Sequence, residues 1–152
     1  MYSRAETSRI RKEFWIKFGQ FMKPVPNAEG RRINWPNYKT GIKDIYFRMK
    51  AERDFVSVGI EIAHGDAEYQ ELIFDHFTQL RKILESCTQE EWDWVLHHEN
   101  EVGQIVSKIE KVKKGLNVME EKDWASIISF LKPRIIALDE FWDLVKPGFE
   151  DL

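Results

Sequence analysis

Residues 33–63 read INWPNYKTGIKDIYFRMKAERDFVSVGIEIA, and the rest of the predicted fold is built around them. Apolar and polar residues alternate over 44–50 and again over 55–63, with the polar link 51–54 between them. Alternation with a period of two is typical of half-buried β-strands, and a short polar link between two such strands is typical of a hairpin. We therefore expect a β-hairpin with one apolar face and one polar face.

The length of the hairpin loop sets which residues face one another. A four-residue loop places Tyr46 opposite Gly59 on the polar face. The same loop places Asp44 opposite Glu61 at the far end of the hairpin. A slip of one residue would turn every apolar side chain to solvent, so we expect the apolar faces of the two strands to coincide.

Three other stretches have the apolar spacing of amphipathic helices. They cover residues 4–22, 66–86 and 121–145. Thr88 and Glu91 form a capping box, which predicts a fourth, short helix over 88–96. Because Pro133 lies inside the last stretch, we expect a kink there or two abutting helices.

Two further stretches have the pattern of strands. Residues 103–113 alternate, and residues 116–118 follow a Lys-Gly turn as a short fourth strand. The order of elements is then α-β-β-α-α-β-β-α, without the regular alternation of parallel βαβ units. We therefore expect an α+β fold, with helices covering an antiparallel sheet of three to four strands. The length of the chain predicts a single domain over residues 1–152.

The composition indicates a soluble globular protein. Hydrophobic residues make up 43% of the chain and charged residues 32%. The sequence contains no apolar run of about 18 residues or more, and its N-terminus lacks the apolar core of a signal peptide. The single Cys87 excludes an intramolecular disulfide. We therefore expect a cytoplasmic protein with no membrane partner.

Charge is divided unevenly along the chain. Residues 1–50 hold 12 Lys and Arg against 4 Asp and Glu, whereas residues 51–152 hold 11 against 22. A basic first third can mark a surface for nucleic acid or for an acidic partner. Alternatively, folding brings the two parts together and their charges neutralise one another.

Residues 27–43 form a long aromatic connection before the hairpin, which we call the loop. Aromatic and basic residues from the loop and from the polar hairpin face form a candidate binding surface. Rings beside Lys and Arg suit stacked bases with paired phosphates, and they suit a peptide or protein partner equally well. For Trp35 and Tyr38, the alternative is that the rings anchor the loop to the core. The candidate binding residues are Trp35, Asn37, Tyr38, Lys39, Tyr46, Arg48 and Glu61.

Five segments of the chain resemble a known family. They are FWIKFGQFMKP (14–24), INWPNYKTGIKDIYFRM (33–49), EEWDW (90–94), DWASIISFL (123–131) and ALDEFW (137–142). In this order they resemble the bacterial family called domain of unknown function 4268, over nearly the whole chain. Members occur alone or C-terminal to nuclease-like domains of the PD-(D/E)XK type. The resemblance implies an accessory role in nucleic-acid processing or defence, and it supplies no catalytic residues to carry over.

The hairpin only partly matches a nuclease site. That chemistry needs one acidic residue on the first strand and an acidic-x-Lys on the second, to hold a divalent metal ion. Asp44 and Glu61 have this layout, but Ala63 stands where lysine is required. A metal-dependent hydrolase that uses Asp44 and Glu61 is therefore the alternative interpretation.

The sequence as a whole favours a non-enzymatic interaction module. We expect no catalytic residues, no metal and no cofactor, and we expect the partner to be a protein or a nucleic acid. A homodimer joined by the exposed aromatic residues is a further hypothesis for this surface.

Overall fold

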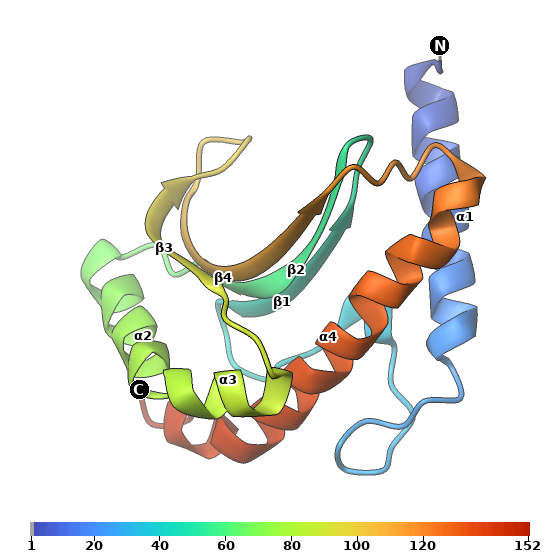
Figure 1. Ribbon diagram of the computed structural model, residues 1–152. Coiled ribbons are helices and arrows are strands. Elements are labelled where there is room, and N and C mark those ends of the chain that lie inside the picture. The colour runs from blue at the N-terminus through green and yellow to red at the C-terminus, as the bar shows by residue number, and fades with distance from the viewer. Residues whose placement is uncertain (1) are drawn as a thin grey trace.

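Within residues 2–152, which the computed structural model describes, four strands form one antiparallel sheet and four helices pack around it (Figure 1). The order across the sheet is β1-β2-β4-β3. The strands are β1 (Ile45–Ala51), β2 (Phe55–Ile62), β3 (Asp93–Glu99) and β4 (Ile105–Lys114). The helices are α1 (Arg4–Met22), α2 (Ala67–Gln79), α3 (Arg81–Thr88) and α4 (Trp124–Val145). The predicted α+β fold and element order are confirmed.

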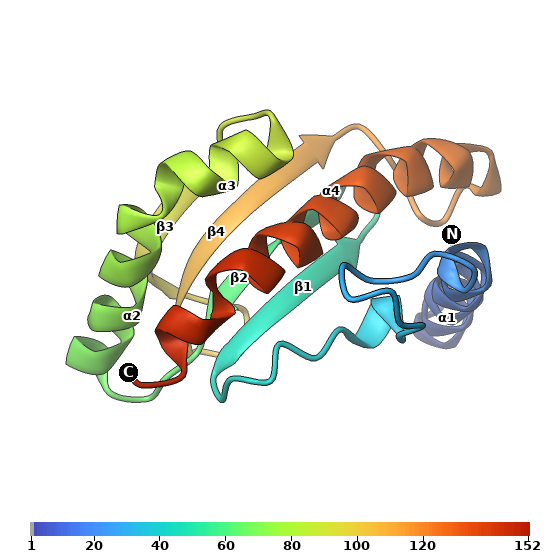
Figure 2. The same cartoon turned by 90° about the horizontal axis from the view of Figure 1, so that it is seen from below.

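The helices gather on one side of a curved sheet. In Figures 1 and 2, α4 runs along the convex face, α2 and α3 lie beside it, and α1 stands near the start of α4. The concave face points away from the helices, and the connection 100–104 between β3 and β4 rises over it. No helix within residues 2–152 is both long and apolar enough to span a lipid bilayer.

The hairpin keeps its predicted faces, but its register differs from the prediction by two residues. Tyr46 pairs with Glu61 rather than with Gly59. The turn is shorter than expected, because the N–H of Glu52 donates to the carbonyl oxygen of Phe55 at 2.9 Å and leaves two residues in the loop. A shift of two residues preserves the side-chain faces, so the apolar residues still meet beneath the helices.

The predicted helix over 88–96 is wrong, because this segment contains strand β3. Thr88 ends α3 instead of starting a helix. Its hydroxyl donates to the carbonyl oxygen of Leu84 at 2.8 Å and accepts from the indole N–H of Trp92 at 2.9 Å. The following residues pair with β4, and this tertiary pairing overrides the local capping signal.

Two other predicted elements differ from the structure, and one alternative for the last helix is excluded. The helix expected over 66–86 breaks at Leu80 into α2 and α3. Residues 116–118 form no strand; instead the N–H of Val118 donates to the carbonyl oxygen of Glu52 at 3.0 Å, beside the hairpin turn. Helix α4 continues through Pro133 as one helix, so of the two alternatives for this position, a kink or two abutting helices, the second is wrong.

The core lies between the convex face of the sheet and the helices. Its largest fully buried side chains include Trp35, Phe14, Phe18, Phe77, Phe141, Met22, Ile45 and Ile60. Gly59 lies at the centre of the sheet, where β2 and β4 approach closely. A Cβ atom at this position would lie 2.4 Å from the carbonyl oxygen of Ile109. The close approach therefore requires glycine at this position.

Candidate binding site at the edge of strand β1

Strand β1 forms one edge of the sheet, with β2 as its neighbour. Hydrogen bonds join Glu52 to Phe55 at one end of the hairpin and Ala63 to Asp44 at the other. In an antiparallel ladder, hydrogen-bonded pairs alternate with non-bonded pairs. The even-numbered residues of β1 therefore bond to β2, and the odd-numbered residues direct their backbone N–H and C=O groups outward.

The outward backbone groups of β1 divide into a covered part and an open part. The carbonyl oxygen of Ile45 accepts from the hydroxyl of Thr40 at 2.7 Å, and its N–H donates to Ile42 at 3.3 Å. Within residues 2–152, no hydrogen bond reaches the outward groups of Phe47 or Met49. The middle of β1 therefore presents two unpaired donors and two unpaired acceptors.

A groove runs along this open edge. It has a volume of about 450 Å³ and is lined by residues 36–49, which include most of β1 and the preceding connection. Figure 2 shows this connection running alongside β1. The groove therefore has a strand edge on one side and a loop on the other.

Five of the seven predicted binding residues line the groove. They are Asn37, Tyr38, Lys39, Tyr46 and Arg48. Trp35 does not line it, because its ring is buried and its indole N–H donates to the carbonyl oxygen of Val25 at 3.0 Å. Glu61 lies on the concave face, where its carboxylate accepts from Arg48 at 3.2 Å.

Tyr38 fixes the loop wall of the groove. Its hydroxyl donates to the buried carboxylate of Asp139 on α4 at 2.5 Å, and its ring stacks on Phe47 with centroids 4.7 Å apart. Burial raises the pKa of the Tyr38 phenol above its ordinary value of 10, and the Asp139 carboxylate raises it further. Tyr38 is therefore an anchor of the loop as well as a lining residue.

Two more hydrogen bonds tie the loop to α4. The second carboxylate oxygen of Asp139 accepts from the backbone N–H of Ala28 at 2.6 Å. The indole N–H of Trp142 donates to the carbonyl oxygen of Thr40 at 2.8 Å. The loop is therefore held at both ends, and the groove is formed before any partner arrives.

The groove carries more positive than negative charge. Lys39, Lys43 and Arg48 line it together with Asp44. The guanidinium of Arg48 lies 4.2 Å from the ring centroid of Tyr46. Within residues 2–152, neither Lys39 nor Lys43 forms an ion pair.

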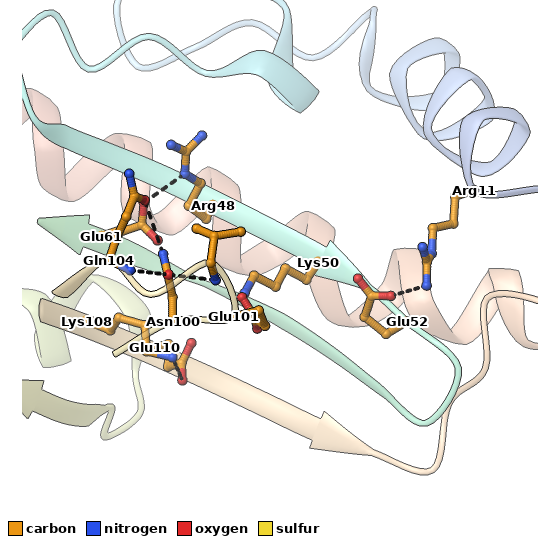
Figure 3. Close-up of polar contacts among 11 residues, drawn as sticks. Arg11, Arg48, Lys50, Glu52, Glu61, Asn100, Glu101, Gln104, Lys108 and Glu110 are labelled. Atoms are coloured by element: carbon orange, nitrogen blue, oxygen red, sulfur yellow. Dashed lines mark hydrogen bonds and ion pairs between the residues drawn. The ribbon is translucent and has the colours of Figure 1, made fainter. Parts of the chain in front are cut away.

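The concave face, in contrast, pairs its charges. Figure 3 shows Arg48 beside Glu61, Lys50 beside Glu101 and Lys108 beside Glu110. The three nitrogen–oxygen distances are 3.2, 3.6 and 3.3 Å. A backbone hydrogen bond and the nearby Lys50 ammonium lower the pKa of the Glu101 carboxyl. This face therefore offers little unpaired charge to a polyanion.

Ion pairs also join the basic first third of the chain to the acidic remainder. Arg11 of α1 contacts Glu52 at the hairpin turn, as Figure 3 shows. The pairs that Arg48 and Lys50 form on the concave face likewise cross this division. The uneven charge of the sequence is therefore partly neutralised in the folded chain.

Asp44 and Glu61 do not face each other. The N–H of Ala63 donates to the carbonyl oxygen of Asp44 at 2.8 Å, so Ala63 lies opposite Asp44, and Tyr46 lies opposite Glu61. Asp44 has a φ of 66° and lies in the turn before β1. Among residues 2–152, no three His, Cys, Asp or Glu side chains gather as a metal site would require. The predicted opposition of the two carboxylates is wrong.

A second cavity, of about 550 Å³, lies between the loop and α4. Its walls include Glu29, Asp143 and Glu150, together with the buried Asp139. Both carboxylate oxygens of Asp139 are already occupied by Tyr38 and by the backbone. The buried acid of this cavity therefore holds the loop in place, and the β1 groove is the better candidate for a binding site.

A family model described as domain of unknown function (DUF4268) matches residues 10–146. The chain belongs to the DUF4268 family. The match contains the whole groove, from the loop wall to the end of β1, so the binding site proposed below lies within the DUF4268 domain. No curated protein and no solved structure matches the chain.

Proposed function

We propose that this DUF4268 domain is a non-enzymatic interaction module that binds its partner in the β1 groove. The observation that carries the proposal is that the backbone N–H and C=O groups of Phe47 and Met49 are unpaired, beside a loop that hydrogen bonds hold against α4. Natural proteins usually cover, bulge or charge a sheet edge, because an open edge pairs with other chains. A regular open edge with a preformed groove suits a partner that binds there.

A protein partner agrees best with the groove. Outward N–H and C=O groups match the backbone of another polypeptide, whereas a nucleic acid backbone offers phosphate acceptors and no such ladder. Nucleic acid is the alternative partner, supported by Lys39, Tyr46 and Arg48, which would contact phosphates and bases. The concave face adds little to this alternative because its charges are paired.

The biological setting that we propose is nucleic-acid processing or defence in the cytoplasm, with the domain in an accessory role. Support for the setting comes from the resemblance to family members that follow nuclease-like domains. Support for the compartment comes from the half-buried Cys87, whose thiol pKa is raised by burial. Such a thiol is poorly reactive and suits a reducing environment.

The hydrolase alternative has no comparable support. Its two carboxylates lie in different surroundings, since Glu61 accepts from Arg48 and Asp44 lies at the end of the groove. Glu61 is neutralised by Arg48 and does not lie opposite Asp44, so the two carboxylates are poorly placed to share a metal ion.

A selection experiment tests the proposed function. The full chain is used to select from a random peptide display library and from random pools of single-stranded DNA and RNA. Each enriched ligand is then measured against the groove variant Lys39→Ala/Tyr46→Ala, in which two exposed lining side chains are removed. We expect enriched peptides whose affinity falls at least tenfold in the groove variant.

The matched control is Lys12→Ala/Leu144→Ala, which removes a cation and a large apolar side chain from exposed positions on α1 and α4. This control should bind the selected peptides as the natural chain does. Ligands that bind both variants equally, or three selections without enrichment, would contradict a binding role for the groove.

A further inference from the structure

We infer that the β1 groove takes an extended acidic peptide, which pairs with β1 as a fifth strand of the sheet. This inference rests on the proposed function and names the class of partner and the mode of binding. An added strand forms main-chain hydrogen bonds to an open edge, while alternate side chains supply specificity.

The backbone of β1 has the geometry for such pairing. The outward groups of Phe47 and Met49 recur at a spacing of two residues, as one side of a ladder requires. At Ile45, the outward groups are already bonded to the loop, so pairing must begin at Phe47. A neighbouring strand would lie about 4.8 Å from β1, on the side where the groove opens.

The opposite edge of the sheet lacks this geometry. Strand β3 has a bulge between Val95 and His98, and His97 within it has a φ of 51°. The backbone N–H of His97 donates to the hydroxyl of Ser107 at 3.1 Å. Bulges twist an edge away from pairing and protect it against other chains. The contrast between the two edges places the added strand at β1.

Charge and side-chain direction specify the peptide. Its residues on the concave side would lie beside Tyr46, Arg48 and Lys50, and those on the other side would lie beside Phe47 and Met49. Within residues 2–152, Lys39 and Lys43 of the loop form no ion pair, whereas Arg48 and Lys50 are paired with Glu61 and Glu101, so the two loop lysines favour carboxylates in the peptide. Phe47 and Met49 favour apolar side chains on the other side. The expected peptide therefore alternates acidic and apolar residues.

A second copy of this chain fits the edge poorly. With Ile45 already bonded, two β1 strands could pair antiparallel about residue 48 or about residue 49. The first register sets Arg48 against Arg48 of the second copy, and the other sets Arg48 against Lys50. Like charges directly opposite one another destabilise a strand pair. An acidic peptide places no cation opposite Arg48 and brings carboxylates to Lys39 and Lys43, which form no ion pair within residues 2–152, so it is the occupant that we propose.

A titration with defined peptides tests the inference. The probe is an acetylated, amidated and fluorescently labelled peptide of sequence EVEIEVE, followed by fluorescence anisotropy against the full chain. We expect saturable binding that weakens as salt rises. The lysine analogue KVKIKVK should bind at least tenfold more weakly because it reverses the charge. A version of EVEIEVE that is N-methylated at its Val and Ile amides should lose at least as much affinity, because in an antiparallel pair these are the amides that donate to β1.

Two variants of the protein complete the test. Met49→Pro removes one outward N–H from the edge strand while leaving the β1–β2 hydrogen bonds in place. Lys39→Glu/Lys43→Glu reverses the charge of two exposed residues of the loop wall. Each should weaken binding of EVEIEVE at least tenfold, and circular dichroism would verify that both are folded. If Met49→Pro does not fold, the N-methylated peptide tests the same hydrogen bonds.

The outcomes separate this inference from the proposed function. Equal binding of the N-methylated peptide, or binding of KVKIKVK in place of EVEIEVE, would overturn the fifth strand. Failure of EVEIEVE while selected ligands still depend on Lys39 and Tyr46 would overturn it and leave the proposed function standing. Groove-dependent binding of an oligonucleotide alone would identify nucleic acid as the partner.

Discussion

Tyr38 illustrates how one residue can be both part of a surface and part of the scaffold. From the sequence, an aromatic residue in a loop with Pro and Asn can be either a binding residue or an anchor that packs the loop onto the core. In the structure Tyr38 is an anchor, because its hydroxyl donates a hydrogen bond to Asp139, and its ring also lines the groove. No sequence pattern could pair these residues, because they lie 101 positions apart.

Replacing Tyr38 by Phe should lower the free energy of unfolding by about 1–2 kcal/mol at neutral pH, because Asp139 loses a buried hydrogen-bond donor. The folded state raises the pKa of Tyr38, so the contribution of its phenol is complete below pH 10 and is lost as pH rises above that value. Urea unfolding at pH 7 and in steps above pH 10 should show that the difference in free energy of unfolding between the natural chain and Tyr38→Phe becomes smaller as pH rises.

The matched control for this prediction is Tyr46→Phe, which removes an exposed hydroxyl on the other face of β1. It should change stability by less than about 0.5 kcal/mol. A gap between Tyr38→Phe and the natural chain that stays constant above pH 10 would contradict the assigned role of the phenol.

Gly59→Ala should lower the free energy of unfolding by about 2 kcal/mol or more, since the new methyl group would meet the backbone of Ile109. Gly65 provides the control, because a Cβ there meets nothing within 4 Å. Gly65→Ala should be neutral or slightly stabilising. Thermal unfolding of both variants measures the difference, and equal midpoints would mean that β2 and β4 do not approach as described.

At the scale of elements, the sequence predicted the faces of the hairpin but not its register. The apolar alternation fixes which side chains share a face, whereas the register depends on how many residues the turn uses. The turn residues Arg53 and Asp54 carry no strong signal for a two-residue turn, such as Asn-Gly. The position of Asp44 relative to Glu61 was therefore wrong, and with it the support for a shared metal site.

Helix caps also show that a local sequence pattern does not always predict the structure. Asp66 caps α2, because its carboxylate accepts from the N–H of Tyr69 at 3.0 Å. Thr88 and Glu91 carry an equally clear capping pattern, yet the segment that follows forms β3. A local signal decides the structure only where long-range pairing does not compete with it.

Asp66→Ala should destabilise the chain by about 1 kcal/mol, because the first turn of α2 loses its side-chain acceptor. Asp75, which is exposed further along the same helix, is the matched position. Asp75→Ala should have an effect of less than about 0.5 kcal/mol. Urea unfolding of the two variants gives the comparison, and equal losses would argue against the cap.

At the scale of the whole molecule, the fold class followed from hydrophobic patterning. The order of elements also agrees, although the helix over 88–96 and the strand over 116–118 do not form and other segments take their places in the order. The candidate site could be predicted from the sequence only in part, because hydrophobic patterning does not show which strand lies at the edge of the sheet. Five of the seven residues that the sequence singled out line one groove. The sequence did not single out Thr40 or Asp139, which close part of the edge and hold the loop, because their roles depend on contacts made in the folded chain.

The distribution of charge over the folded chain gives a prediction about nucleic acid. Ion pairs on the concave face and between α1 and the hairpin pair three of the twelve basic residues of the first third, Arg11, Arg48 and Lys50, with carboxylates from the rest of the chain. Double-stranded DNA should therefore bind no more tightly than about 10 µM at 150 mM salt, within the range of non-specific binding. Anisotropy titrations at 50 and 200 mM salt measure this, and submicromolar binding at the higher salt would favour the nucleic-acid alternative.

Amide hydrogen exchange measures directly whether the outer edge of β1 is open. In the free chain, we predict slow exchange for Tyr46 and Arg48, whose N–H groups bond to β2, and fast exchange for Phe47 and Met49. Saturation with EVEIEVE should slow the two fast amides at least tenfold. Uniformly slow exchange along β1 in the free chain, or fast amides that the bound peptide leaves unchanged, would contradict the account.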